Sequence, residues 1–196
     1  MTSLKGRLLV ATPALFDANF RRTVVLVGEH GEEGAMGLVL NRPATVTVGE
    51  AVPPLAVVVG EEARVHVGGP VQPEAVLVLA EFEDASLAAT LVAGDVGFAS
   101  SDDDLEALAG ATRRARVFAG YSGWGPGQLE AELEEESWLV EPVEGVDLFP
   151  GPDDDLFAAV LRRKGGTYRV LALMPEDPSA ESSRRRAQVL PRAGGP

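Results

Sequence analysis

The chain has 196 residues, no cysteine, two histidines and a net charge of −13 at neutral pH. Without cysteine it forms no disulfide, no iron–sulfur cluster and no Cys-ligated zinc site, and His30 and His66 stand in no metal-binding spacing. The acidic surplus opposes nucleic-acid binding, and no apolar run approaches the ~20 residues that cross a bilayer. We therefore expect a cytoplasmic protein with no metal, cofactor or membrane partner, although a magnesium or calcium site made only of carboxylates stays open.

The predicted strands follow one another closely in the first half of the chain and alternate with helices in the second. Consecutive strands favour the α+β class over a doubly wound parallel sheet. The continuous aliphatic run at 23–27 predicts a strand buried on both faces, and its return at 35–40 predicts a β-hairpin around a turn at 29–34. In chain order, the predicted strands are residues 6–12, 23–27, 35–40, 55–60, 64–67, 75–82, 96–99, 116–121, 138–140 and 167–174.

Four helices are predicted, three of them from their capping residues. Thr47 and Glu50 form a capping box for residues 47–52. Ser101 is expected to cap residues 102–109, residues 128–136 follow a glycine-rich loop, and Asp153 is expected to cap the last helix. We expect residues 1–178 to form a single domain. Residues 179–196, rich in Arg, Pro and Gly, are predicted to be a disordered tail.

Short clusters of basic residues interrupt this acidic chain, and they are interpreted as solvated ends of elements or as tail residues. They are Arg113, Arg114 and Arg116; Arg162, Arg163 and Lys164; and Arg184, Arg185 and Arg186.

The segment around Ser122 superficially resembles a nucleophile elbow, but Trp124 replaces the second glycine of that pattern and both histidines lie upstream. The loop 123–127 before the third helix can present backbone N–H groups to an anion. Alternatively, its glycines only allow Trp124 to pack closely.

Two further groups of polar residues lie on the predicted hairpin. His30, with Glu29 beside it, is a candidate general base, although a histidine in a hairpin turn is commonly plain surface. Two amides and two guanidiniums at the outer strand ends can bind a carboxylate or a phosphate. These are Asn19, Arg22, Asn41 and Arg42. The alternative is that they cap turns and pair with Asp17 or Glu50.

Three motifs resemble the YqgE/AlgH family of bacterial proteins: DANFRRTVVLVGEHGEEGAMGLVLNRP from Asp17, GGPV from Gly68 and GYSGWGPGQLEAEL from Gly120. The resemblance extends from Leu4 to about Pro178. It implies an α+β fold in which a largely antiparallel, bifurcated sheet curls into a pseudo-barrel with helices outside. It implies no known reaction, and one branch of the family is labelled a transcriptional regulator.

Carried over position by position, the polar motif residues of the family fall on Asn19, Arg22, Glu29, His30, Asn41, Arg42, Tyr121, Trp124 and Gln128. Ser122 stands where the family commonly has alanine, which argues further against a nucleophile.

The sequence thus predicts a regulatory protein that binds a small anionic ligand or a protein partner, without known catalysis. The predicted binding residues form one shared polar pocket: Asn19, Arg22, Asn41, Arg42, Gly69, Tyr121, Trp124 and Gln128. The alternative is an enzyme acting on an anionic small molecule with His30 or Glu29 as general base. Direct binding of DNA is a third class that the acidic composition opposes.

Overall fold

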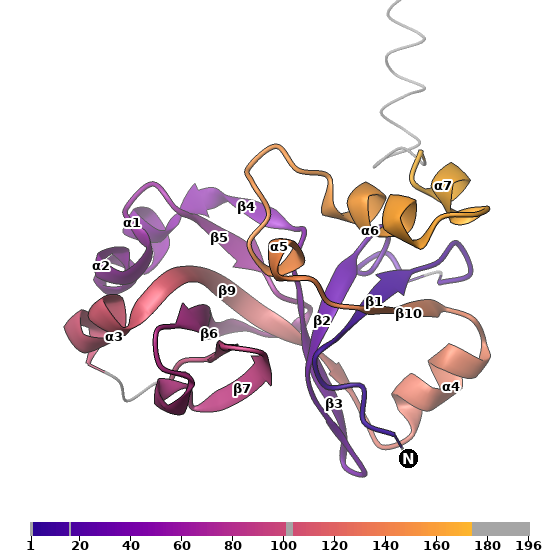
Figure 1. The fold of residues 1–196 in the computed structure, drawn as a ribbon, viewed down its shortest axis with the longest axis horizontal. Coiled ribbons are helices and arrows are strands. Elements are labelled where there is room, and N and C mark those ends of the chain that lie inside the picture. Colours follow the sequence, from indigo (N-terminus) through magenta and orange to yellow (C-terminus); the bar gives the residue numbers. More distant parts are fainter. Residues whose placement is uncertain (1, 16, 101–103, 174–196) are drawn as a thin grey trace, which may run out of the picture.

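The computed structural model describes residues 2–15, 17–100 and 104–173. Within these residues ten strands form a continuous mixed sheet, with the order β10-β1-β2-β3-β9-β6-β8-β7 and with β4 and β5 off this path (Figure 1). The strands are β1 (Arg7–Ala11), β2 (Val24–Gly31), β3 (Gly34–Val39), β4 (Pro43–Thr47), β5 (Arg64–Val67), β6 (Val71–Phe82), β7 (Thr90–Ala93), β8 (Val96–Phe98), β9 (Thr112–Trp124) and β10 (Trp138–Pro142).

Helices in the described part of the chain are short and lie around the sheet (Figure 1). They are α1 (Val48–Ala51), α2 (Ala56–Val59), α3 (Leu105–Ala111), α4 (Gln128–Glu134), α5 (Gly145–Leu148), α6 (Leu156–Lys164) and α7 (Tyr168–Leu171), with 3-10 turns at Pro53–Leu55 and Ala85–Leu87. None of them is long and apolar enough to cross a membrane.

Strand β9 is the point at which the sheet divides. One edge of β9 pairs with β6 along most of its length. On the other edge, residues 117–119 pair in parallel with β5, and residues 122–124 pair antiparallel with β3. The remaining strand pairs are antiparallel. The predicted α+β class with a largely antiparallel, bifurcated sheet is confirmed, and the curled sheet does not close into a barrel.

The hairpin strands are buried on both faces, as their continuous aliphatic runs predict. Because side chains alternate along a strand, Leu26 and Leu38 face one core, which α6 covers, whereas Val25 and Val39 face another core together with Trp124. The hairpin is longer than predicted: β2 continues to Gly31 and β3 begins at Gly34, with a register shift between Val27 and Glu29.

Two predicted strands are helical. Residues 55–60 lie in a 3-10 turn and α2, because Pro53 and Pro54 occupy the first positions of the turn, where a proline's fixed φ suits a helix. Residues 168–171 of the predicted final strand form α7, which packs beside α6 rather than pairing with a strand.

Two of the predicted caps also differ from the structure. The N-cap of α6 is Asp155 rather than Asp153. The predicted cap Ser101 lies outside the described residues, and Asp104 caps α3. The predicted tail at 179–196 is likewise outside them.

Candidate functional site

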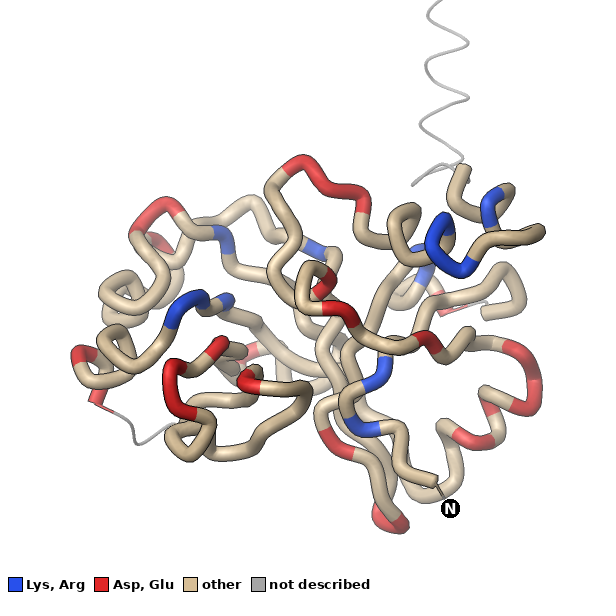
Figure 2. The backbone as a smooth tube through the Cα atoms, viewed as in Figure 1, with Lys and Arg blue, Asp and Glu red and all other residues tan. Residues whose placement is uncertain are grey.

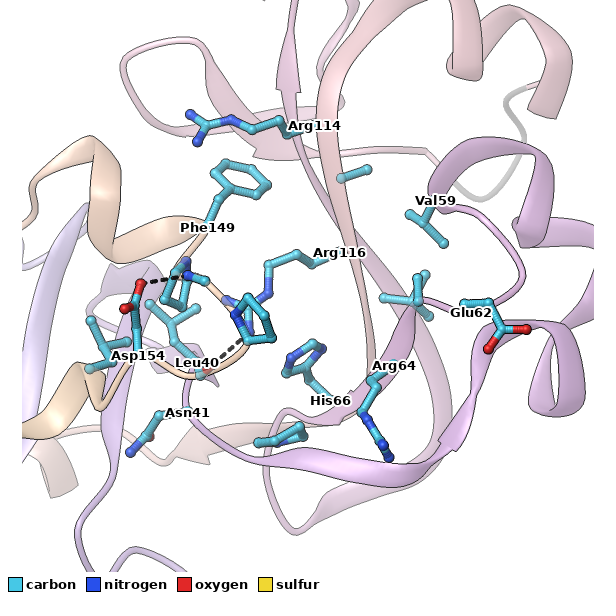
Figure 3. Close-up of a pocket in the computed structure, with 18 of the residues that line it drawn as sticks. Leu40, Asn41, Val59, Glu62, Arg64, His66, Arg114, Arg116, Phe149 and Asp154 are labelled. Atoms are coloured by element: carbon cyan, nitrogen blue, oxygen red, sulfur yellow. Dashed lines mark hydrogen bonds between the residues drawn. The ribbon is translucent and has the colours of Figure 1, made fainter.

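A cleft of about 710 Å³ lies where β5 and β9 meet the loop between α5 and α6. Figure 3 shows Arg116 near its centre, His66 and Arg64 on one side, and Phe149 on the other. The lining is unlike the acidic chain as a whole, because it includes four arginines but only two carboxylates, Glu62 and Asp154. In Figure 2 acidic residues mark many loops and α4, whereas basic residues mark the beginning of β9.

The period of two along each strand places these basic side chains on one face. Arg64 and His66 are two positions apart on β5, and Arg114 and Arg116 are two positions apart on β9, so the members of each pair share a face of the sheet. The parallel register pairs His66 with Phe118, whose rings are 5.4 Å apart between centroids. The fork of the sheet therefore assembles a basic cleft from two strands that are distant in sequence.

Arg116 is held at the centre of the cleft by backbone carbonyls. Its guanidinium donates hydrogen bonds to the carbonyl oxygens of Leu40 at 2.7 Å and Leu148 at 3.0 Å, and it lies 5.1 Å from the ring centroid of Phe118. Burial lowers the pKa of Arg116 to about 10, so it stays charged at neutral pH. A guanidinium has five N–H donors, and these two bonds leave others for a ligand.

The four arginines of the cleft differ in how their charges are compensated. Arg114 pairs with Glu81, with its Nε 2.7 Å from the carboxylate, and Arg113 pairs with Glu83 at 3.2 Å. Arg64 instead donates to the carbonyl oxygens of Ala44 and Thr45. Among the described residues, neither Arg64 nor Arg116 has a carboxylate within ion-pair distance. The positive charge of the cleft is thus concentrated at these two side chains.

His66 adds a neutral group beside this charge. Its Nδ1 is buried and has no hydrogen-bond partner among the described residues. Burial, with the nearby charge of Arg116, lowers the pKa of His66 to about 4, although the backbone at Val117 and Arg64 opposes part of this shift. The imidazole is therefore uncharged at neutral pH.

The rest of the wall is apolar. Leu40 and Leu156 line it beside Asn41, and Val58 and Val59 line it from α2. Phe149 packs its ring 4.5 Å from the guanidinium carbon of Arg114. A bound molecule would therefore meet apolar surface and charge together.

Asn41 is the one predicted binding residue in the lining of this cleft. Its carboxamide is used within the hairpin: Oδ1 accepts from the N–H of Val24 at 2.9 Å, and Nδ2 donates to the carbonyl of Arg22 at 2.8 Å. Arg42 donates to the carbonyl of Arg21 at 3.0 Å. Arg22 pairs with Asp155 and lies over the ring of Phe157. The contacts of these three residues hold the strand ends and α6 together.

The predicted partners from the glycine-rich loop belong to the other face of the sheet. Trp124 packs in the core opposite to α6, where it stacks with Phe20 at 6.2 Å between centroids. Its Nε1 donates to Glu132 Oε2, and Gln128 Nε2 donates to Glu132 Oε1, both at 2.9 Å. The structure therefore does not assemble one shared pocket from Arg22, Trp124 and their neighbours.

Asn19, Gly69 and Tyr121 complete the predicted set. Asn19 is exposed in a turn where its N–H bonds to Asp17. Gly69 lies against the backbone of Tyr121, where a Cβ would come within 2.3 Å of the carbonyl carbon. Tyr121 packs on the core beneath α6. A role for these residues in ligand binding stays a prediction.

His30 lies outside the cleft, and both of its ring nitrogens are engaged. Nδ1 accepts from the N–H of Leu4 at 2.9 Å, and Nε2 is 2.7 Å from Glu130 Oε1. Only 2% of its side chain is exposed. Glu29 is exposed beside it. His30 therefore joins the N-terminal segment to the hairpin and α4, with no nitrogen open to a substrate.

The spacing of basic residues in the sequence is a signal for the cleft. Arg64 and His66 are spaced by two within the predicted strand 64–67, and Arg114 and Arg116 are spaced by two where β9 begins before the predicted strand 116–121. This spacing places a charged row on one sheet face. Treating the basic cluster at 113–116 as a solvated end missed this row. In the described part of the chain, no three His, Cys, Asp or Glu side chains gather as metal ligands.

The fold and the cleft define an α+β protein with a bifurcated sheet and a basic, ligand-sized cleft at the fork. Residues 8–169 match the model of the AlgH-like family, and the chain belongs to that family. A UPF0301 protein of Streptomyces coelicolor is 45% identical over 185 residues, covering 91% of this chain and 96% of the relative. Another, from Streptomyces avermitilis, is 43% identical with the same coverage.

Two solved structures share the fold. The crystal structure of protein DIP2367 from Corynebacterium diphtheriae has a TM-score of 0.81 and 26% identity, covering 89% of this chain and 94% of that one. The solution structure of the AlgH protein from Pseudomonas aeruginosa has a TM-score of 0.70 and 33% identity, covering 90% and 98%. The resemblance read from the sequence motifs is thereby confirmed.

Proposed function

We propose that the protein binds a small organic anion in the cleft at the fork of the sheet and serves a regulatory role by binding it. One observation carries this proposal: Arg64 and Arg116 line a cleft, without a described carboxylate partner, in a chain whose net charge is −13. Charge-assisted hydrogen bonds to a guanidinium are the usual way in which proteins hold carboxylates and phosphates.

The dimensions and the lining favour an organic anion over a simple ion. A volume of about 710 Å³ lies within the ~300–1,000 Å³ range of small-molecule sites. The apolar wall at Leu40, Val58 and Phe149 would cover the body of the ligand, while the arginines bind its anionic end. A carboxylate or phosphate on an apolar or sugar-like body fits both parts.

Binding without conversion is favoured over the enzymatic alternative. A general base needs reach to its substrate and, commonly, a group that orients it. His30 is closed off by Leu4 and Glu130, and His66 has no described carboxylate partner. The arrangement supports recognition of an anion, because neither histidine combines an open nitrogen with a described carboxylate that orients it.

A thermal-shift screen of phosphate, pyrophosphate, citrate and adenosine monophosphate tests this proposal. At a hundredfold excess over Kd, mass action adds about 2.7 kcal/mol to the folded state, a rise in Tm of roughly 5–10 °C for a chain of this size. Arg64→Met should reduce the rise, because it removes an uncompensated charge from the cleft.

Arg162→Met is the matched control, because it removes the same charge from an exposed position on α6. Arg116→Lys is a second test, since it keeps a cation but not the fixed fork of donors. A screen in which no anion raises Tm, or in which Arg162→Met weakens binding as much as Arg64→Met, contradicts the proposal.

A further inference from the structure

The imidazole of His66 distinguishes this cleft from a simple arginine site. The ring lines the cleft (Figure 3) and lies 5.4 Å from the ring of Phe118, the same ring over which Arg116 is placed at 5.1 Å. A ligand held by Arg116 is therefore within reach of His66. The two side chains offer different chemistry, because one is a charged donor and the other is neutral.

The environment of the ring decides which nitrogen carries the proton. A neutral imidazole has one N–H donor and one acceptor nitrogen. Nδ1 is the buried nitrogen and has no hydrogen-bond partner among the described residues, so Nε2 is the nitrogen that a ligand in the cleft can reach. We place the proton on Nδ1, because the guanidiniums that line the cleft with His66 favour a lone pair, rather than an N–H, on the nitrogen that faces them. Nε2 then presents its lone pair to the cleft.

A hydrogen-bond acceptor at His66 Nε2, surrounded by arginines, favours one kind of group on the ligand. The side chains of Arg64, Arg113, Arg114 and Arg116 are donors only, so Nε2 is matched by a donor on the ligand. An ammonium group would be repelled by these positive charges, whereas a hydroxyl or an amide N–H carries no charge. The group next to the anion is therefore a neutral donor.

We propose that the ligand of the cleft is a hydroxylated organic anion, such as a hydroxy acid or a sugar phosphate. Arg116 and Arg64 bind its carboxylate or phosphate, and His66 Nε2 accepts a hydrogen bond from the neighbouring hydroxyl. His66 is then the residue that determines specificity. This inference rests on the proposed function, because it assumes that an anion occupies the cleft.

Matched pairs of probes test the inference. Calorimetry would compare L-malate with succinate, and glycerol 3-phosphate with propyl phosphate, so that each pair differs in hydroxyl groups. The hydroxylated member of at least one pair should bind about threefold to tenfold more tightly, the effect of one neutral hydrogen bond. His66→Phe should abolish this ratio without weakening the deoxy member, and His66→Gln should retain part of it.

Nitrogen NMR of the histidine rings gives a readout that a merely structural role would not move. The chain has only two histidines, and His30, engaged by Leu4 and Glu130, is the internal reference. The hydroxylated probe should shift the Nε2 signal of His66 and leave His30 unchanged. If both members of each pair bind equally, or if His66→Phe keeps the ratio, the inference is wrong while the anion site stands. If no probe binds, the anion site itself is wrong.

Discussion

Arg22 and Asp155 form an ion pair of 2.8 Å that joins the end of the loop before β2 to the first turn of α6. The Arg22 side chain is only 8% exposed, and its guanidinium carbon lies 4.6 Å from the ring centroid of Phe157. Asp155 also accepts a hydrogen bond from the N–H of Ala158 as the N-cap. One carboxylate thus both begins α6 and fixes it to the hairpin.

Asp155→Ala should lower the free energy of unfolding by about 2 kcal/mol, because it removes a cap worth ~1 kcal/mol together with a partly buried ion pair. Asp155→Asn retains a capping oxygen and should cost less than about 1 kcal/mol. Urea denaturation at two salt concentrations measures both variants. Equal losses in the two variants would mean that the charge, rather than the cap, dominates at this position.

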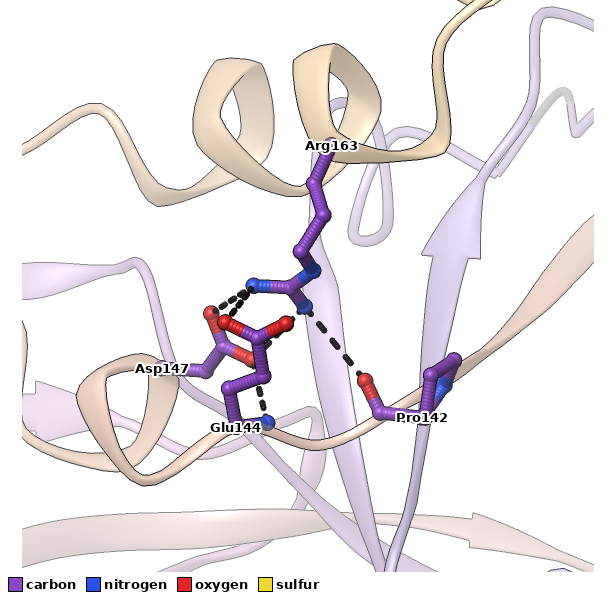
Figure 4. Close-up of polar contacts among 4 residues, drawn as sticks. All are labelled: Pro142, Glu144, Asp147 and Arg163. Atoms are coloured by element: carbon purple, nitrogen blue, oxygen red, sulfur yellow. Dashed lines mark hydrogen bonds and ion pairs between the residues drawn. The ribbon is translucent and has the colours of Figure 1, made fainter.

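A second attachment of α6 is the bidentate pair between Arg163 and Asp147, which Figure 4 shows with Glu144 and the carbonyl of Pro142. Only 2% of the Asp147 side chain is exposed. Arg163→Met should destabilise the fold by about 3 kcal/mol, because a buried carboxylate loses its cation.

Arg162→Met is the control for that measurement, because the neighbouring Arg162 is exposed and its loss should change stability by less than about 0.5 kcal/mol. Chemical denaturation of both variants makes the comparison. Similar values for the two would show that the Asp147 carboxylate is satisfied without Arg163.

Gly69 is predicted to be essential to the fold around β9. Its φ is +154°, and an added Cβ would lie 2.3 Å from the carbonyl carbon of Tyr121. Gly69→Ala should therefore cost at least about 3 kcal/mol, since backbone would have to move. Gly110→Ala, at a helical position with no atom within 4 Å of the new Cβ, should instead stabilise by roughly 0.5–1 kcal/mol. Tm measurements on both variants distinguish the two environments.

The lowered pKa of His66 predicts that the folded protein loses stability in acid. The pKa of His66 is about 4 in the folded protein and about 6.5 in an unfolded chain. Between pH ~4 and ~6.5, His66 is therefore protonated in the unfolded chain but neutral in the folded protein. The stability contributed by the neutral ring is complete above pH ~6.5 and is lost as pH falls toward about 4, by up to roughly 3 kcal/mol. His66→Phe should flatten this part of the difference curve against the wild type. An unchanged curve would contradict a buried, neutral His66.

Several elements followed from local sequence alone. The aliphatic runs of β2 and β3 have few alternatives to a buried hairpin, and the capping box of Thr47 and Glu50 forms as predicted. The three motifs also identified the family. Local propensity misled at residues 55–60, where a valine-rich segment is helical after Pro53 and Pro54, and at residues 168–171, which form α7 beside α6.

The tertiary structure alone decided where the polar groups face. Asn41 and Trp124 stand in two of the three family motifs, but Asn41 lines the cleft whereas Trp124 packs in the core on the other face of the sheet. Conversely, His66 and Arg116 are 50 positions apart in the chain and meet only because β5 pairs in parallel with β9. The sequence by itself determined the hairpin strands, the capping box of Thr47 and Glu50, and the family. Pairing register determined the cleft, because it depends on long-range contacts that no local pattern encodes.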